Sequence, residues 1–389
     1  MRNDRSEAGN PMDAMTVLIA AIAASAIGAL FYNVLPVYLG TAQDYRGLDN
    51  RSIGFLTSAF FLGYNVVTAS AFFWIRRISW RRIIAVSTPV AALALYAGTM
   101  VDSYPVLLFS VAVAGGAFAS IYGVGTTILG DSSNPARWYG IKMAAEALVG
   151  AILLFVLPAM VIERWGFNGT VLAVIVTLVL LSPFLFWTPA SGAKAAASEM
   201  CADERNASTQ TPLIWAALLA LLLFFSGASA IWAFMERIGA NGGHDPVAVG
   251  VLLSVTLIFA VGGSITASVL GGRIANAPLF LGGAVLFVIA LFFLNSALEF
   301  TPYAVGACVV TFAIGFLLPV SVTEIAELDS DGRYIVLSVP AIGIGAMTGP
   351  GIAGVLAQQN EFGSLLWFAA ITIVIASVLI VIAARKGST

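Results

Sequence analysis

Charged side chains are scarce in this chain, and their scarcity limits where it can fold. Asp, Glu, Lys and Arg make up 10% of the 389 residues and hydrophobic residues make up 60%, with a mean hydropathy of +0.96. A soluble domain carries about a quarter charged residues, and a soluble fold of this size has too little interior to hide so much apolar surface. We therefore expect most of the chain to lie in a lipid bilayer.

The residues that build catalytic and metal sites are also rare. The chain has one histidine and two cysteines, Cys201 and Cys308, which suggest neither a disulfide framework nor a thiolate metal site. It has no H-E-x-x-H motif, no paired intramembrane aspartates and no G-x-x-x-x-G-K-[ST] loop, and a net charge of −2 argues against a basic nucleic-acid surface. We expect no cofactor, metal or nucleic-acid partner, and no direct ATP hydrolysis within this chain.

Long hydrophobic stretches fill most of the sequence. Stretches of about twenty apolar residues are typical of membrane-crossing helices, and these do not alternate as the strands of a membrane barrel would. The first is too long for a secretory signal and is expected to be retained. The twelve predicted spans lie at about 15–39, 52–74, 83–101, 106–129, 138–161, 169–188, 212–235, 247–270, 278–297, 302–322, 334–357 and 364–384.

A polar segment, 189–211, divides these spans six and six. It is rich in Ala, Ser and Thr and predicts a solvated cytoplasmic linker between an N-terminal bundle, 1–188, and a C-terminal bundle, 212–389. The third, sixth, ninth and twelfth spans are nearly all apolar, whereas most others contain more polar and small residues. We expect every third helix to face lipid and the rest to enclose an interior, as in carriers built from two related halves.

The positive residues predict the orientation of the chain in a cell membrane, inner or plasma. With both termini in the cytoplasm, thirteen Lys and Arg residues fall inside and four outside, which agrees with the positive-inside rule. The inside set is Arg2, Arg5, Arg76, Arg77, Arg81, Arg82, Arg137, Lys194, Arg205, Arg273, Arg333, Arg385 and Lys386; the outside set is Arg46, Arg51, Arg164 and Arg237.

Two motifs resemble patterns of the major facilitator superfamily, as does the six-plus-six arrangement. The loop 74–82 ends on the Arg81–Arg82 pair of that family's G-x-x-x-D-R-x-G-R-R-like loop but lacks its acidic residue. The segment 345–354 resembles the family's G-x-x-x-G-P-x-x-G-G pattern, with Ala353 in place of one glycine. That pattern marks many antiporters when it lies on span five, and span five has no Gly-Pro here. The resemblance implies two six-helix bundles but not drug antiport.

Span eleven has its own physical interpretation. Small residues let helix backbones approach closely, and a proline within a membrane helix frees a carbonyl that must find another partner. A bend or a moving gate is one interpretation, and tight static packing is the alternative. The candidate gating residues are Gly345, Gly349, Pro350, Gly351 and Gly354.

Lys142 and Glu146 are the clearest candidates for transport chemistry. They lie one turn apart on the same face of span five, within an apolar run. Charged residues at membrane depth usually face a cavity, and neither the helix dipole nor the order of the pair favours Lys before Glu. We expect Glu146 to be a protonatable group tuned by burial and by Lys142, or Lys142 to attract an anionic substrate. The alternative is a structural pair in which Lys142 reaches the cytoplasm.

Other polar residues lie in helices expected to face the interior. Glu236 and Arg237 lie at the outer end of span seven. They could form an outer gate, contact a substrate, or be ordinary interfacial charges. His244, in the loop that follows, is expected to be a turn residue. Amides in hydrocarbon need partners, so the amide candidates are expected to bond across helices or to a solute. The remaining candidates for an amphipathic cavity are Tyr32, Asn33, Tyr64, Asn65, Tyr122 and Trp232.

An acidic cluster, 324–331, lies before span eleven. Its carboxylates, with Arg333, could form a metal site, but a solvated loop with helix-capping acids is the favoured interpretation.

Together these features predict a secondary active transporter. It would move a small organic solute, uncharged or singly charged, across the bilayer by alternating access, with H+ as the coupling ion and the chain acting as a monomer. The alternatives are a facilitative uniporter, a channel or a non-transporting membrane sensor. A membrane-embedded enzyme is the remaining one, and the sequence supplies its chemistry poorly.

Overall fold

The computed structural model describes residues 10–192, 211–295, 299–329, 334–358 and 362–387. In these ranges the chain is helical, and the one β-bridge, between Gly271 and Ile274, belongs to no strand. Most of the predicted linker, 189–211, falls outside the described residues, as do Asp331 and Arg333 of the acidic cluster.

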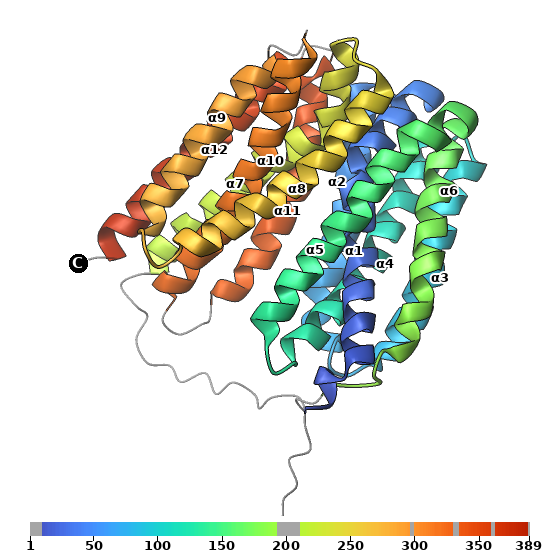
Figure 1. Cartoon of the computed structure of the whole chain (residues 1–389), viewed down its shortest axis with the longest axis horizontal. Helices are drawn as coiled ribbons and strands as arrows, with labels where there is room; N and C mark the ends of the chain where they lie inside the picture. Colours follow the sequence, from blue (N-terminus) through green and yellow to red (C-terminus); the bar gives the residue numbers. More distant parts are fainter. Residues whose placement is uncertain (1–9, 193–210, 296–298, 330–333, 359–361, 388–389) are drawn as a thin grey trace, which may run out of the picture.

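Six long helices precede the linker and six follow it (Figure 1). The first six are α1 Met15–Arg46, α2 Asn50–Trp74, α3 Trp80–Met100, α4 Tyr104–Gly130, α5 Pro135–Val156 and α6 Glu163–Leu181, with short 3-10 helices η1 Pro11–Asp13 and η3 Ser182–Trp187 and a π-helix η2 Leu157–Ile162. The second six are α7 Thr211–Asn241, α8 Pro246–Leu270, α9 Asn276–Asn295, α10 Phe300–Leu328, α11 Ser338–Leu356 and α12 Gly363–Gly387, with η4 Ile335–Leu337 before α11.

Eleven helical segments in the described ranges are long and apolar enough to cross a membrane. The predicted spans 138–161 and 169–188 form one of these, a continuous segment of 51 residues. At 1.5 Å per residue it would reach about 76 Å, more than twice a hydrocarbon core of about 30 Å. The chain turns at Gly166, whose φ of 54° and ψ of −140° are not helical, and α5 and α6 are two separate helices in Figure 1 that both pack on α1. The segment therefore accounts for two crossings, which reconciles eleven segments with twelve predicted spans.

Gly166 is required at this turn for two reasons. Its positive φ is unfavourable for residues with a side chain. A methyl group there would also lie 2.6 Å from the ring of Tyr45 on α1. The turn between α5 and α6 thus depends on a glycine packed beneath an aromatic ring.

The two halves repeat one packing scheme. In the first half α4 packs on α2 and α3, and α1 packs on α4, α5 and α6; in the second half α10 packs on α8 and α9, and α7 packs on α10, α11 and α12. The main contacts between the halves join α2 to α11, α5 to α8 and α1 to α7. The pairs α2–α11 and α5–α8 exchange places when the halves are exchanged, so the interface is pseudo-symmetric.

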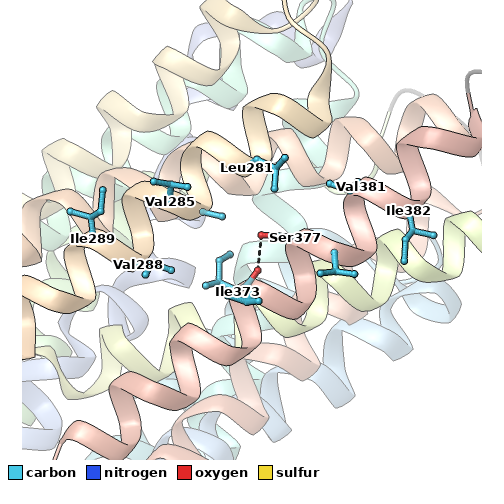
Figure 2. A pocket seen from close by; sticks show the side chains of 11 residues that line it. Leu281, Val285, Val288, Ile289, Ile373, Ser377, Val381 and Ile382 are labelled. Atoms are coloured by element: carbon cyan, nitrogen blue, oxygen red, sulfur yellow. Dashed lines mark hydrogen bonds between the residues drawn. The ribbon is translucent and has the colours of Figure 1, made fainter.

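The helices predicted to face lipid lie at the outer edges of the two bundles (Figure 1). Each carries largely exposed apolar side chains: Leu93 on α3, Leu180 on α6, Phe292 on α9 and Trp367 on α12 are 66–72% exposed. A groove of about 520 Å³ between α9 and α12 is lined by aliphatic side chains, and the Ser377 hydroxyl there is bonded to the Ile373 carbonyl at 2.8 Å (Figure 2). Such a groove suits acyl chains and offers nothing to a polar solute.

Candidate functional site

The ionisable pair on α5 is buried as the sequence indicates. The helix begins where the Asn134 side chain accepts a hydrogen bond from the Arg137 backbone N–H, with Pro135 at its first position. Glu146 lies eleven residues after Pro135, about 16 Å along the helix axis, and therefore well inside the predicted span 138–161. Lys142 is 5% exposed, and its Nζ lies 3.2 Å from Glu146 Oε1.

Aromatic rings hold the Lys142 ammonium in place. Its Nζ donates a hydrogen bond of 2.7 Å to the Tyr122 hydroxyl on α4 and lies 4.1 Å from the centre of that ring. The Tyr139 ring centre is 5.8 Å away. The ammonium therefore contacts both a carboxylate and aromatic faces, an arrangement that stabilises a cation away from water. Lys142 is 5% exposed rather than extended into solvent, and the transport role of the pair, as against a structural one, remains a prediction.

Glycines bring the neighbouring helices onto this pair. A methyl group on Gly28 of α1 would lie 2.8 Å from the Tyr122 α-carbon, and one on Gly150 of α5 would lie 2.7 Å from Asn33 Cβ. Asn33 donates from Nδ2 to the Glu146 carbonyl oxygen at 2.9 Å. Its amide thus bonds across helices, the first of the two roles expected for it, and ties α1 to the turn that carries Glu146.

Two buried polar atoms of the candidate residues make no aligned hydrogen bond within the described part of the chain. Glu146 Oε1 is buried and contacts the Lys142 ammonium at 3.2 Å as an ion pair that is not aligned as a hydrogen bond. Asn65 Nδ2 on α2 is also buried without a partner. A methyl group on Gly343 of α11 would overlap the Asn65 amide, so this amide lies where the two halves meet. Buried polar groups are rarely left unpaired, and a bound solute or water would satisfy them.

A row of aromatic rings runs from the second half of the molecule toward the pair. Trp232 on α7 donates from Nε1 to the Tyr32 carbonyl oxygen at 3.0 Å. Successive ring centres lie 6.4 Å apart for Trp232–Tyr32, 5.7 Å for Tyr32–Phe61, 6.2 Å for Phe61–Tyr64 and 6.3 Å for Tyr64–Tyr122. The row thus brings Tyr32, Tyr64, Tyr122 and Trp232 together. It also includes Phe61, which was not a candidate from the sequence because it lies within an apolar stretch.

Glu236 and Arg237 form a network across the halves at the end of the molecule opposite the linker. Arg237 donates to both carboxylate oxygens of Asp44 on α1, at 2.7 and 3.0 Å, and to both oxygens of Glu236, at 2.5 and 2.7 Å. Glu236 approaches α1 because Gly40 has no side chain there. Asp44 was not singled out from the sequence, where it is an ordinary acid near a helix end.

Further contacts join α2 to α11 at the same end. Asn50 at the start of α2 donates to the Ala357 carbonyl oxygen at 2.5 Å, and the Ser58 hydroxyl donates to the Met347 carbonyl oxygen at 2.7 Å. Gly354 packs against Gly54, where a methyl group would lie 3.1 Å from the Gly54 α-carbon. These contacts close the end of the molecule that carries Arg237.

The glycines of span eleven serve two faces of α11. A methyl group on Gly345 would lie 2.6 Å from the Leu222 carbonyl oxygen of α7, and one on Gly349 would overlap the backbone of the same helix. Gly351 and Gly354 face α2 instead, and α11 continues as one helix through Pro350. The described structure therefore uses these residues for close packing, and their role as a gate remains a prediction.

A further ion pair, at the linker end, was missed from the sequence. Asp131 follows α4 and accepts two hydrogen bonds from Arg76 in the loop after α2, at 2.5 and 2.8 Å. The Asp131 side chain is 2% exposed, and hydrogen bonding to it raises the pKa of Arg76 above its ordinary value. The loop has no acidic residue of its own, so its charge is paired with another helix.

The acidic cluster and the histidine have local roles. Asp329 accepts hydrogen bonds from the backbone N–H groups of Tyr334 and Ile335, at 2.7 and 2.8 Å, so this acid caps the turn before α11. The prediction of a solvated loop is wrong here, because α10 continues to Leu328 and the Glu324 and Asp329 residues are 5% and 7% exposed. His244 lies in the turn after α7, where its ring stacks on Tyr303 at 5.4 Å. In the described ranges no three His, Cys, Asp or Glu residues are placed to hold a metal.

Comparisons with known proteins agree with this architecture. The profile of the Major Facilitator Superfamily matches residues 17–328, while no protein of curated function matches the sequence. Similar solved structures include the nucleoside transporter NupG (14% identity, 96% of this chain and 99% of that one, TM-score 0.69) and a D-xylose–proton symporter (12% identity, 94% and 96%, TM-score 0.74). An inward-facing, occupied bacterial homologue of the human lysosomal transporter Spinster is also similar (15% identity, 95% and 96%, TM-score 0.68). The chain belongs to the major facilitator superfamily and is an all-α, multi-pass membrane protein with that fold.

Proposed function

We propose that this transporter is proton-coupled, and that Glu146 is the group that takes up the proton. Superfamily membership makes the chain a carrier of solutes; the coupling and the solute are the proposal. The observation that supports it is the Lys142–Glu146 pair, which is buried within the predicted span of α5 and in which the ammonium lies 3.2 Å from Glu146 Oε1. Ionisable groups at this depth are costly and usually functional, and a carboxylate beside an ammonium is poised to change its protonation when its surroundings change.

The surrounding residues have defined roles in this proposal. Tyr122 positions the ammonium, Asn33 fixes the backbone at Glu146, and the aromatic row with Asn65 receives the solute between the halves. One structural relative is named as a proton symporter and another as a nucleoside transporter, which agrees with proton coupling and with a small organic solute.

Alternating access would open and close the two ends of the molecule in turn. The structure is closed at the end where Arg237 bridges α7 and α1 and α2 packs on α11. We place this end outside the cell and the linker end, with both termini, in the cytoplasm, because the positive residues predict that orientation. The Arg237 network is then the outer gate, the chain works as a monomer, and transport proceeds as the halves rock around the site.

Transport into proteoliposomes tests the coupling. Wild-type protein should accumulate a solute from a panel containing xylose, uridine and small carboxylates when a pH gradient is imposed, and should only equilibrate it without the gradient. Glu146→Gln should abolish accumulation. The matched control Glu163→Gln should retain it, because Glu163 is exposed at the start of α6. Accumulation by Glu146→Gln with unchanged pH dependence would overturn the proposal, and equilibration alone by the wild type would favour the uniporter.

A further inference from the structure

Charge is confined to one place in the membrane interior of this protein. Among the described helices, Lys142 and Glu146 are the only charged residues more than six positions from a helix end. The helices packed against α5 add no other ionised side chain near them: α8 has no titratable residue at all, α1 contributes the Asn33 amide and α4 contributes Tyr122. Tyr64 of α2 lies next to Tyr122. The net charge of the site therefore depends on this pair alone.

We propose that the solute is an organic monoanion with an apolar body, which binds Lys142 once Glu146 has taken up a proton, so that anion and proton cross together without net charge. This inference rests on the proposed role of Glu146 and names the class of solute that its site would take. The Lys142–Glu146 juxtaposition, with the aromatic row beside it, is the geometry that supports it.

The argument is a balance of charges. In the empty site the ammonium and the carboxylate cancel. Protonation of Glu146 alone leaves the Lys142 ammonium without a counter-ion among apolar side chains, and a buried charge without a partner is strongly unfavourable. A neutral solute does not correct this imbalance, whereas a monoanion restores neutrality. Proton uptake and anion binding therefore favour each other at this site.

The Lys142 ammonium has capacity to receive an anion. An ammonium has three N–H donors, and one is used on the Tyr122 hydroxyl at 2.7 Å. The contact with Glu146 is an ion pair at 3.2 Å without hydrogen-bond alignment. Once Glu146 is neutral, the remaining donors can turn to a carboxylate oxygen, and Tyr122 keeps the ammonium in position during the exchange.

The aromatic row is suited to the rest of the solute. Phe61 and Trp232 are 8% and 4% exposed, and Tyr64 lies between Phe61 and Tyr122. Flat apolar faces beside a single cationic group favour a small monocarboxylate with an aromatic or branched aliphatic body. A sugar-like solute could bond to tyrosine hydroxyls of the row and to the Asn65 amide, but it would leave the Lys142 ammonium without a counter-ion once Glu146 is protonated.

Binding to the purified full-length protein in nanodiscs tests the proposal without interference from passive permeation of weak acids. The probes are benzoate and 3-methylbutanoate, each paired with its uncharged amide, with xylose and uridine as neutral solutes. Calorimetry in buffers of different ionisation enthalpy measures how many protons are taken up per solute bound. The expected result is one proton per anion, with affinity rising about tenfold per unit fall in pH where Glu146 is ionised in the free protein.

Variants separate the roles of the two residues. Lys142→Gln should weaken anion binding at least tenfold, while Lys142→Arg should restore part of it and the exposed control Arg164→Gln should leave it unchanged. The double variant Lys142→Gln/Glu146→Gln keeps the site neutral, so it should fold even where a single variant does not. It should bind no anion preferentially over the amide and take up no proton.

The outcomes distinguish this inference from the proposed function beneath it. Proton-linked binding of xylose, uridine or the amides in preference to the anions would overturn the monoanion while leaving Glu146 as the coupling group. Anion binding without proton uptake, or uptake that persists in Glu146→Gln, would overturn the coupling itself. Binding of no probe at any pH would overturn the monocarboxylate class.

Discussion

Neutralising Asp44 should open the end of the molecule that Arg237 closes. Asp44→Asn keeps the shape of the side chain but removes its charge from a two-hydrogen-bond contact that joins α1 to α7. Hydrogen bonds to charged groups contribute about 1.5–3 kcal/mol. The Asp44 side chain is 54% exposed, and Arg237 keeps Glu236 as a partner, so solvent screening reduces the expected loss to about 1 kcal/mol. The ratio of open to closed molecules should therefore rise about fivefold.

Distances between spin labels at Glu163 and Asn241, exposed positions at this end of the two halves, would report the change as a larger population at long distance. Asp102→Asn is the matched control, because Asp102 pairs with Arg46 inside the first half and is 96% exposed. An unchanged distance distribution in Asp44→Asn, or an equal change in Asp102→Asn, would refute the outer gate.

Three further perturbations follow from the structure. Gly343→Ala places a methyl group on the Asn65 amide. It should reduce transport severely, as measured by uptake, while the free energy of unfolding falls by only about 1–3 kcal/mol, the usual effect of overpacking, as measured by thermal unfolding. Asp131→Asn leaves Arg76 without its buried carboxylate and should lower the free energy of unfolding by about 1–3 kcal/mol. This loss is smaller than the loss from breaking a fully buried pair because Arg76 is partly hydrated. Thermal unfolding at neutral pH measures the loss. Capping hydrogen bonds lower the pKa of Asp49 below its ordinary value, and Asp49 should stabilise the start of α2 by about 1 kcal/mol relative to Asp49→Ala. This stabilisation should be complete at a pH above the ordinary pKa and should disappear as the pH falls through the lowered pKa. Unfolding of the two proteins compared across acidic pH tests the expected dependence.

The spans were predictable because hydropathy and length are local properties of the sequence. The period of three in polarity also identified the outer helices, since a helix that faces lipid needs no polar or small residues. Hydropathy also divided the continuous helical segment 137–187 into the predicted spans 138–161 and 169–188, and the turn at Gly166 lies between them. The helical hydrogen bonding of this segment continues past the end of α5, however, and only the backbone at Gly166 shows where the chain turns.

The candidate site was predictable only where its parts are close in sequence. Lys142 and Glu146 are one turn apart, and a helix places them together whatever surrounds it. The contact of Asp44 with Arg237 joins residues 193 positions apart, and that of Arg76 with Asp131 joins residues 55 apart. Which helix faces meet depends on packing throughout the bundle, so neither partner could be assigned from one sequence.

Infrared difference spectra recorded across a pH titration would test most directly whether Glu146 carries the proton. Acidification of the wild-type protein should produce the carbonyl band of a protonated carboxylic acid in an apolar environment, and this band should be absent from Glu146→Gln and present in Glu163→Gln. A band that persists unchanged in Glu146→Gln would contradict the account, because the proton would then reside on another group.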